Sequence, residues 1–196
     1  MRLILATGAL ICLTPLSVRA SDLHAAASRD DTETIRLLVN EGVDVNDQDN
    51  ENGWSPLHWA AGRGHSNATR LLINAGANIN TTDKGGRTPL FLAAALGRTD
   101  IVRILINADA DLNATDKHGW SPLYVAAVWG RSDIMKLLIN AGADLNVRDK
   151  YGYTPLHIAA ILGRTDMMRI LFNAGADINA RDKDGKTPAD HLKDSK

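Results

Sequence analysis

The sequence predicts an all-α repeat protein, a solenoid of helix–turn–helix units that β-turn or hairpin loops connect. The first observation is a period, since five prolines are each 33 residues apart: Pro56, Pro89, Pro122, Pro155 and Pro188. The second is that each of them follows Ser or Thr, and the third is a pair of alanines four residues beyond each of the first four. A fixed period of roughly 20 to 50 residues is typical of stacked supersecondary units that bury their apolar faces against their neighbours.

The repeat contains start and stop signals for a first helix. In the unit around Thr154, the threonine is the expected N-cap and Pro155 the first helical residue, where the missing N–H costs no hydrogen bond. The alanine pair is small enough for neighbouring helices to approach closely. A glycine that tolerates a positive φ then ends the helix in each of these units: Gly64, Gly97, Gly130 and Gly163.

A second helix is predicted directly after the first. Its expected N-caps are Ser66, Thr99, Ser132 and Thr165. Apolar pairs such as Leu137-Leu138 supply its buried side, and a glycine such as Gly142 ends it. Asp109 replaces that glycine in one unit, so we expect a strained left-handed residue there. The turns beyond carry recurring asparagines, which we interpret as turn-forming residues: Asn46, Asn80, Asn113, Asn146 and Asn179.

The period divides residues 21–196 into a single repeat domain. Residues 22–48 form a first unit without the Thr-Pro start, in which Asp30 stands where later units have glycine. Its polar surface is expected of a terminal capping repeat, because nothing stacks on it. The repeats that follow are residues 49–82, 83–115, 116–148 and 149–181, and residues 182–196 form a partial C-terminal cap.

Period, Ser/Thr-Pro start and paired alanines together resemble the ankyrin repeat, and the resemblance covers about residue 22 to the C-terminus. It implies a protein-binding module. It also implies a structural task for His58 and His157, whose side chains would bond the capping Ser or Thr and a neighbouring turn. Phe91 and Tyr124 replace this histidine in the middle units, which further argues against a metal site or chemistry there.

Residues 1–20 are predicted to be a signal peptide. Arg2 supplies a positive start, residues 3–18 are uncharged and mostly apolar, and Val18-Arg19-Ala20 forms a signal-peptidase site, so that the mature chain begins at Ser21. A retained membrane anchor is the alternative, although the run is short for a bilayer. After cleavage we expect no membrane span. The only cysteine, Cys12, leaves with the signal, so the mature chain cannot form a disulfide.

Charge and motifs exclude several classes of function. The full chain carries a net charge of −1, and loss of the signal leaves 20 basic and 23 acidic side chains, a net charge of −3. Such a balance gives no reason to expect nucleic acid as a partner. The sequence contains no glycine-rich phosphate loop, no metalloprotease motif, no nucleophile elbow and no cysteine pair. We therefore predict no catalytic residue, no metal site, no cofactor and a monomeric, non-catalytic protein.

Function should then depend on positions where the repeats differ. The resemblance implies a partner in a concave groove, against the turns and the exposed side of the first helices. Trp, Tyr and Arg, which are enriched in binding hot spots, concentrate there. The alternative is that the rings stack on one another and on lysine stems, stiffening the turns. The predicted partner-binding residues are Trp54, Arg63, Arg87, Leu96, His118, Trp120, Trp129, Tyr151, Tyr153 and Leu162. Trp59, Leu92, Val125 and Ile158 are expected on the buried side instead.

A signal peptide before a repeat array of this kind indicates a periplasmic or secreted bacterial protein, because arrays that resemble ankyrin repeats are otherwise mostly cytosolic or nuclear. Two tasks fit this location. The first is an exported adaptor or accessory that stabilises a partner protein. The alternative is an inhibitor or immunity protein that blocks a toxin or enzyme, which should bind with nanomolar affinity or better and abolish the activity of its target.

Overall fold

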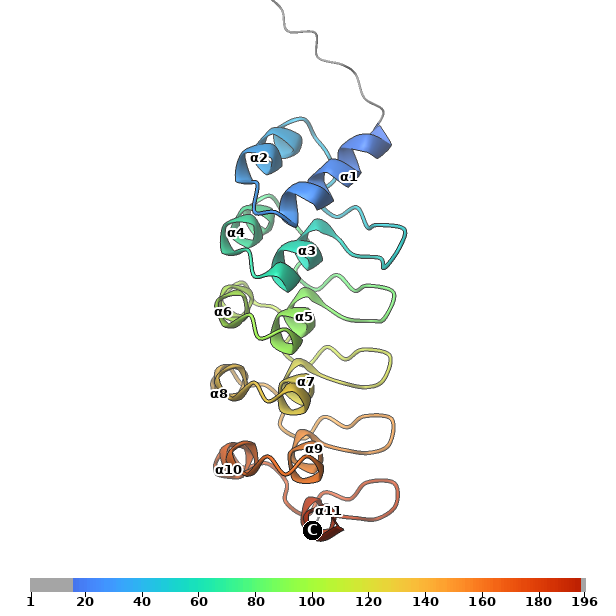
Figure 1. Cartoon of the computed structure of the whole chain (residues 1–196), viewed down its shortest axis with the longest axis vertical. Helices are drawn as coiled ribbons and strands as arrows, with labels where there is room; N and C mark the ends of the chain where they lie inside the picture. The colour runs from blue at the N-terminus through green and yellow to red at the C-terminus, as the bar shows by residue number, and fades with distance from the viewer. Residues whose placement is uncertain (1–15, 195–196) are drawn as a thin grey trace, which may run out of the picture.

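The computed structural model describes residues 16–194, and within that range the chain forms eleven helices and no strand. The helices stack as pairs, with α1, α3, α5, α7, α9 and α11 in one column and α2, α4, α6, α8 and α10 in the other (Figure 1). The connecting loops project to one side. The prediction of an all-α solenoid is confirmed. The bounds are α1 Leu16–Ala27, α2 Thr32–Asn40, α3 Pro56–Arg63, α4 Ser66–Asn74, α5 Pro89–Ala95, α6 Thr99–Ile106, α7 Pro122–Trp129, α8 Ser132–Asn140, α9 Pro155–Ile161, α10 Thr165–Asn173 and α11 Pro188–Asp194.

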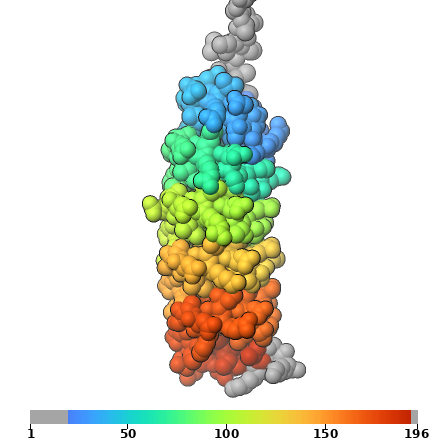
Figure 2. Space-filling model, turned by 90° about the vertical axis from the view of Figure 1, so that its left-hand side faces the viewer, coloured from blue at the N-terminus to red at the C-terminus, as the bar shows by residue number. Residues whose placement is uncertain are grey.

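Each unit occupies one layer across the molecule, as the view onto the second helices shows (Figure 2). Most of the predicted signal peptide, residues 1–15, lies outside the described residues. Helix α1 runs through the predicted cleavage position between Ala20 and Ser21. Among residues 16–194, no helix has the length and apolar character that crossing a membrane requires.

The first helices begin as the sequence predicts. Ser55, Thr88, Ser121 and Thr154 have extended backbones, and each side chain accepts a hydrogen bond from the backbone N–H three residues later. The structural task of the histidine is also confirmed. The Ser55 N–H donates to Nδ1 of His58 (3.1 Å), and Nε2 of the same ring bonds to the carbonyl of Arg87 (2.9 Å). His157 repeats this arrangement with Thr154 and Lys186.

The predicted caps of the second helices were wrong. Ser66, Thr99, Ser132 and Thr165 are the first helical residues, and the cap position belongs to His65, Arg98, Arg131 and Arg164, none of which caps with its side chain. These four side chains instead contact the preceding unit. Their bonds end on carbonyls at the end of its first helix, which have no partner within that helix. The pairs are His65–Ser28 (3.0 Å), Arg98–Gly62 (3.0 Å), Arg131–Ala95 (3.4 Å) and Arg164–Val128 (3.0 Å).

Two further ladders connect the loops of successive units. At the hairpin tips, backbone bonds join Lys84 N to Asn52 O, Lys117 N to Gly85 O, Lys150 N to His118 O and Lys183 N to Tyr151 O, at 2.9–3.0 Å. The recurring asparagines form the other ladder. Their side-chain oxygens accept backbone N–H groups of the next unit, in the pairs Asn46–Asn78, Asn80–Asp111, Asn113–Asp144 and Asn146–Asp177. These asparagines therefore hold neighbouring units together in addition to shaping their own turns.

The core lies between the two helical columns and continues from unit to unit. All eight alanines of the four pairs are fully buried. The leucine three residues before each of the first three pairs is also fully buried: Leu57, Leu90 and Leu123. Asp109 has a φ of 59°, which confirms the expected left-handed residue, and Asp30 has the same φ at the position where later units have glycine.

Candidate functional site

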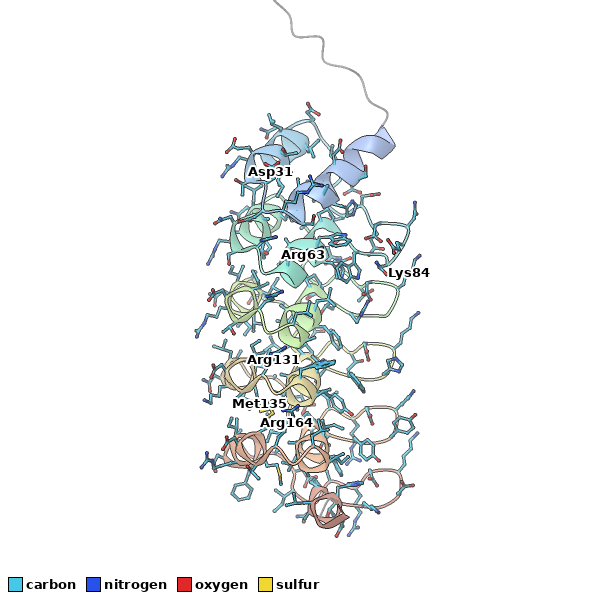
Figure 3. The ribbon with its side chains drawn as sticks, in the orientation of Figure 1. Asp31, Arg63, Lys84, Arg131, Met135 and Arg164 are labelled. Atoms are coloured by element: carbon cyan, nitrogen blue, oxygen red, sulfur yellow. The ribbon has the colours of Figure 1, made fainter. Side chains whose placement is uncertain are left out.

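A cavity of about 500 Å³ opens between the hairpins and the first helices of three successive units. Five of the ten predicted partner-binding residues line it: Trp54, Arg87, Leu96, Trp120 and Trp129. Phe91, Leu92, Ala95, Asp116, Val125 and Arg131 complete the lining. Figure 3 shows Lys84 at a hairpin tip and Arg131 near the junction of the two helical columns. The first helices lie between these two positions.

An aspartate at the start of each hairpin determines the geometry of the hairpin side of this cavity. One oxygen of Asp83 accepts the N–H groups of Gly85 (2.8 Å) and Arg87 (2.9 Å). Asp116 does the same for His118 (2.8 Å) and Trp120 (3.0 Å). The bonds close the turn and fix the residue just before the helix cap, which is the position of Trp54, Arg87, Trp120 and Tyr153.

The other oxygen of these aspartates accepts a side-chain donor in four of the five hairpins. The donors are the Trp59 indole on Asp49 (3.0 Å), the Trp54 indole and Arg87 on Asp83 (3.0 and 2.8 Å), the Tyr124 hydroxyl on Asp149 (2.9 Å) and the His191 ring on Asp182 (2.6 Å). Asp116 is the exception, because Phe91, which occupies the position of Tyr124 one unit earlier, has no donor. Within the described residues, the second oxygen of Asp116 accepts no side-chain bond.

The electrostatics follow from these bonds. Burial opposes ionisation of Asp83, but the bonds from Arg87 and from the turn outweigh it and lower the pKa of the carboxyl. Asp83 and Arg87 form an ion pair with oxygen and nitrogen 2.6 Å apart. Burial, followed by the bond to Asp149, raises the pKa of Tyr124 above its usual range, so the phenol stays protonated and remains a donor.

Trp120 and Trp129 differ in exposure. Trp129 is 57 % exposed at the end of α7, as expected. Trp120, by contrast, is half-buried and packs against the core. Its ring stacks on Tyr124 with centroids 5.2 Å apart. As predicted partner-binding residues, both side chains should be largely exposed in the free protein. This is wrong for Trp120, because the neighbouring ring of Tyr124 supplies a packing surface.

Trp59 also departs from its prediction. Leu92 and Val125 are buried as expected, whereas Trp59 and Ile158 are only half-buried. The N–H of the indole needs a polar partner, and Asp49 of the hairpin provides it. Trp59 packs edge-on against Trp54 with centroids 4.7 Å apart, and the Arg63 guanidinium lies 5.8 Å from the centre of its ring.

The remaining predicted residues lie outside the cavity lining. Leu162 is 48 % exposed and occupies the position of Leu96 and Trp129 two units and one unit earlier. Tyr151 is exposed beneath the Lys150 ammonium, which lies 5.0 Å from its ring centre and 3.5 Å from His118. Tyr151 thus packs against a neighbouring lysine, as in the alternative interpretation, but through the ammonium group. The remaining ring, Tyr153, is half-buried and contacts the rings of His157 and His191.

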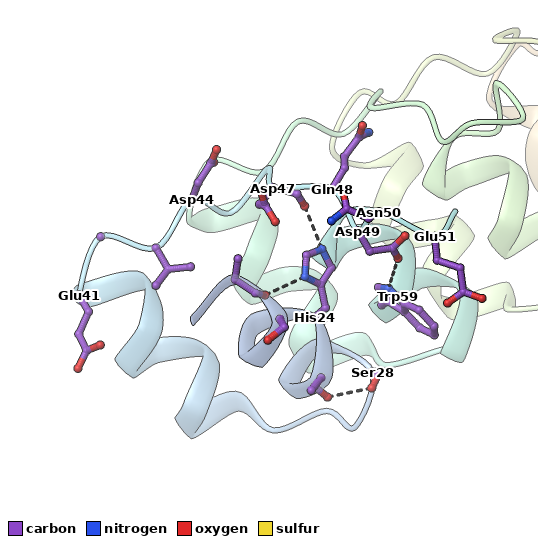
Figure 4. Close-up of a pocket in the computed structure, with 15 residues that line it drawn as sticks. His24, Ser28, Glu41, Asp44, Asp47, Gln48, Asp49, Asn50, Glu51 and Trp59 are labelled. Carbon is purple, nitrogen blue, oxygen red and sulfur yellow. Dashed lines mark hydrogen bonds between the residues drawn. The ribbon is translucent and has the colours of Figure 1, made fainter. Parts of the chain in front are cut away.

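A larger cavity of about 770 Å³, which the sequence did not indicate, lies at the N-terminal end (Figure 4). His24 lies in it and bonds to the carbonyls of Ala20 (2.8 Å) and Asp47 (3.0 Å). Its rim is acidic, with Glu41, Asp44, Asp47, Asp49 and Glu51. Within residues 16–194, no three His, Cys, Asp or Glu side chains are placed to hold a metal ion. Part of its lining comes from α1, which contains the predicted cleavage position. The three-unit cavity is therefore the candidate site.

Comparison with known families agrees with this architecture. A family model described as ankyrin repeats (3 copies) matches residues 23–116 and 109–182. No curated protein matches the chain closely enough to count as a relative. The two matched ranges together include every described helix pair from the second half of α1 to the end of α10. The chain belongs to the ankyrin-repeat family.

Proposed function

We propose that this protein is a non-catalytic adaptor that binds a partner protein on the face formed by its hairpins and first helices. Ankyrin repeats are generally modules for protein–protein interaction. The observation that carries the proposal for this chain is the three-unit cavity, where Trp54, Trp120 and Trp129 line one space. Indole side chains offer a large apolar area at little entropic cost, and they are prominent among binding hot spots.

The exposed apolar residues extend the proposed surface along the array. Leu96 (46 %), Trp129 (57 %) and Leu162 (48 %) lie at the C-terminal ends of the first helices of three consecutive units, Trp129 as the last helical residue and the two leucines as C-caps. Exposed apolar side chains that recur at one position in neighbouring units are typical of a surface that another molecule covers. Trp129 is the central member of this set and also lines the cavity. We therefore place the main anchor of the partner at Trp129.

The location of the task is part of the proposal. The features of residues 1–20 support export to the periplasm or the exterior of a bacterium, with a mature chain that starts at Ser21. N-terminal sequencing of the native protein tests this. A chain that retains Met1 and fractionates with membranes would indicate an uncleaved anchor.

The binding surface is tested by capture with a matched control. Immobilised residues 21–196 are incubated with an envelope extract, in parallel with Trp129→Ala and Phe172→Ala. Phe172 is a suitable control because it is 59 % exposed on α10, outside the proposed surface. We expect a partner that Trp129→Ala loses and Phe172→Ala retains. A partner that is captured equally by all three proteins would place the interface elsewhere. Purification of that partner then separates an accessory, which leaves its activity intact, from an inhibitor, which abolishes it.

A further inference from the structure

We propose that the three-unit cavity takes a basic side chain of the partner, which Asp116 recognises and the surrounding rings enclose. This inference rests on the proposed protein-binding function and adds the chemistry of the anchor. It starts from a break in a repeated pattern. Among residues 16–194, four of five hairpin aspartates bond a side-chain donor with their second oxygen, and Asp116 does not.

The free acceptor lies where a ligand can reach it. Asp116 is half-buried and lines the cavity, while its first oxygen is occupied by the N–H groups of His118 and Trp120. The second oxygen keeps full hydrogen-bonding capacity in a partly apolar setting, where a charge-assisted bond is stronger than in water. An incoming N–H or O–H group would complete the pattern that the other hairpins complete internally.

The walls favour a cation over a neutral donor. Trp54, Phe91, Trp120 and Trp129 line the same space as Asp116. The faces of aromatic rings attract ammonium and guanidinium groups, and indole is the strongest of them. An arginine or lysine side chain combines an apolar stem, which suits Leu92 and Leu96, with a cationic head for Asp116.

The two arginines of the lining do not oppose this assignment. Arg87 forms an ion pair with Asp83 at 2.6 Å, so its charge is compensated. Arg131 follows the C-terminal end of α7 and donates to the carbonyl of Ala95, whereas Asp116 lies before the N-terminal end of that helix. Eight residues of helix separate these ends by about 12 Å. The cavity therefore presents an acceptor at one end and a cation at the other, and the basic head binds at the Asp116 end.

The neighbouring unit supplies the test variant. Tyr124 is buried and donates to Asp149 at 2.9 Å. Phe91 is the buried equivalent one unit earlier, and it lines the cavity together with Asp116. Phe91→Tyr should place a hydroxyl on the second oxygen of Asp116 and occupy it without opening the fold. Asp116→Asn is the second variant, because its amide oxygen still accepts the turn N–H groups while its NH₂ replaces the free acceptor with a donor.

The probe is Nα-acetyl-arginine amide, and the matched neutral probe is Nα-acetyl-citrulline amide, which has nearly the same shape and no charge. Residues 21–196 carry four tryptophans, so each indole N–H gives its own ¹H–¹⁵N signal. We expect the arginine probe to shift the Trp120 and Trp129 signals at millimolar concentration. The citrulline probe should bind the wild type at least tenfold more weakly than the arginine probe does. Phe91→Tyr and Asp116→Asn should each weaken binding of the arginine probe at least tenfold. Equal shifts with both probes, or with the wild type and both variants, would overturn the assignment.

Capture from the envelope extract separates this inference from the proposed function. A partner lost by Trp129→Ala and also by Phe91→Tyr supports both. A partner lost by Trp129→Ala and retained by Phe91→Tyr and Asp116→Asn supports the binding surface and overturns the basic anchor. If the arginine probe binds wild-type protein but no partner depends on Trp129, the cavity recognises cations and the proposed protein-binding surface fails.

Discussion

The carboxylate of Asp30 lies 2.8 Å from the backbone nitrogen of Ala68, a residue 38 positions later in the first turn of α4. Asp30 is also in the left-handed region with a φ of 59°. The aspartate therefore combines a strained backbone with a hydrogen bond that caps a helix of the next unit. Asp109 has the same φ, but it is exposed and its side chain makes no hydrogen bond within the described residues.

The pair gives a matched test of strain against capping. Asp109→Gly should raise the free energy of unfolding by up to about 1 kcal/mol, because glycine adopts a positive φ without a Cβ clash. Asp30→Gly should be at least about 1 kcal/mol less favourable than Asp109→Gly, since the same relief is offset by loss of the cap on α4. Urea melts of both variants measure this. Equal changes would mean that the Asp30 bond contributes nothing to stability.

Trp120 and Trp129 should separate stability from binding. Trp120→Ala should lower the free energy of unfolding by about 2 kcal/mol, because the ring packs on Tyr124 and the core. Trp129→Ala should lower the free energy of unfolding by less than about 1 kcal/mol, and it should weaken binding of the captured partner by about 2 kcal/mol or more. Chemical denaturation beside affinity measurements decides this. Unchanged binding per folded molecule in Trp129→Ala would contradict it.

The two capping histidines should make the array sensitive to acid. Burial is the main cause that lowers the pKa of His58 and of His157, both of which are neutral donors and acceptors in the fold. An unfolded histidine has a pKa of about 6.5. Between that value and the lower folded pKa, the unfolded chain binds more protons, so stability rises with pH. Their contribution is complete above about pH 7 and is lost as the pH falls below about 6.5.

A phenylalanine variant isolates this effect. Phe91 already replaces the histidine in one unit, so His58→Phe and His157→Phe should be accommodated. Each variant should be less stable at about pH 8, since it loses bonds to a cap and a carbonyl. Each should also lose less stability than the wild type between about pH 7 and pH 5. Thermal melts of the wild type and the variants across that range measure this. If stability falls as steeply with decreasing pH in the double variant as in the wild type, other groups cause the acid sensitivity.

The alanine pairs should not tolerate larger side chains. Ala126 is fully buried between units, and Ala126→Leu should destabilise the protein by about 1–3 kcal/mol through overpacking. Ala141 is an exposed residue at the end of α8, so Ala141→Leu should change stability by less than about 0.5 kcal/mol. Denaturant midpoints compare the two, and similar losses would show that spacing between units is not what limits residue 126.

The repeat pattern predicted the local structure within each unit, and it was less informative about the contacts between one unit and the next. Ser55 and Pro56 determine a helix start locally, and this start was predicted correctly. Arg98 and Arg131 carry no local signal, because their partners are carbonyls more than 30 residues earlier. The nearby Thr99 therefore appeared to be the cap, although the free carbonyls of the preceding helix decide the role of this position.

The candidate site shows the same division. Five predicted residues line one cavity because a period of 33 places equal positions on one wall. Phe91 and Asp116 were missed, since Phe91 looks like a routine core residue and Asp116 like a routine turn residue. The signal was nevertheless present: Phe91 is the only non-polar residue among His58, Phe91, Tyr124 and His157. Side-chain exposure, as for Trp120 and Trp59, depends on neighbouring rings and could not be inferred from position alone.

The bonds between units have a consequence for how such a chain can change in length. The hairpin ladder joins one backbone to another, and the Arg98 and Asn113 bonds end on backbone atoms of the adjacent unit. Because these junctions depend little on which side chains the neighbour carries, removal of residues 83–115 would bring matching ends together. A duplicated or deleted 33-residue segment would thus be inherited as a folded, shorter or longer array. The surface of such an array could then diverge toward a new partner, while the hydrogen bonds between its units stay the same.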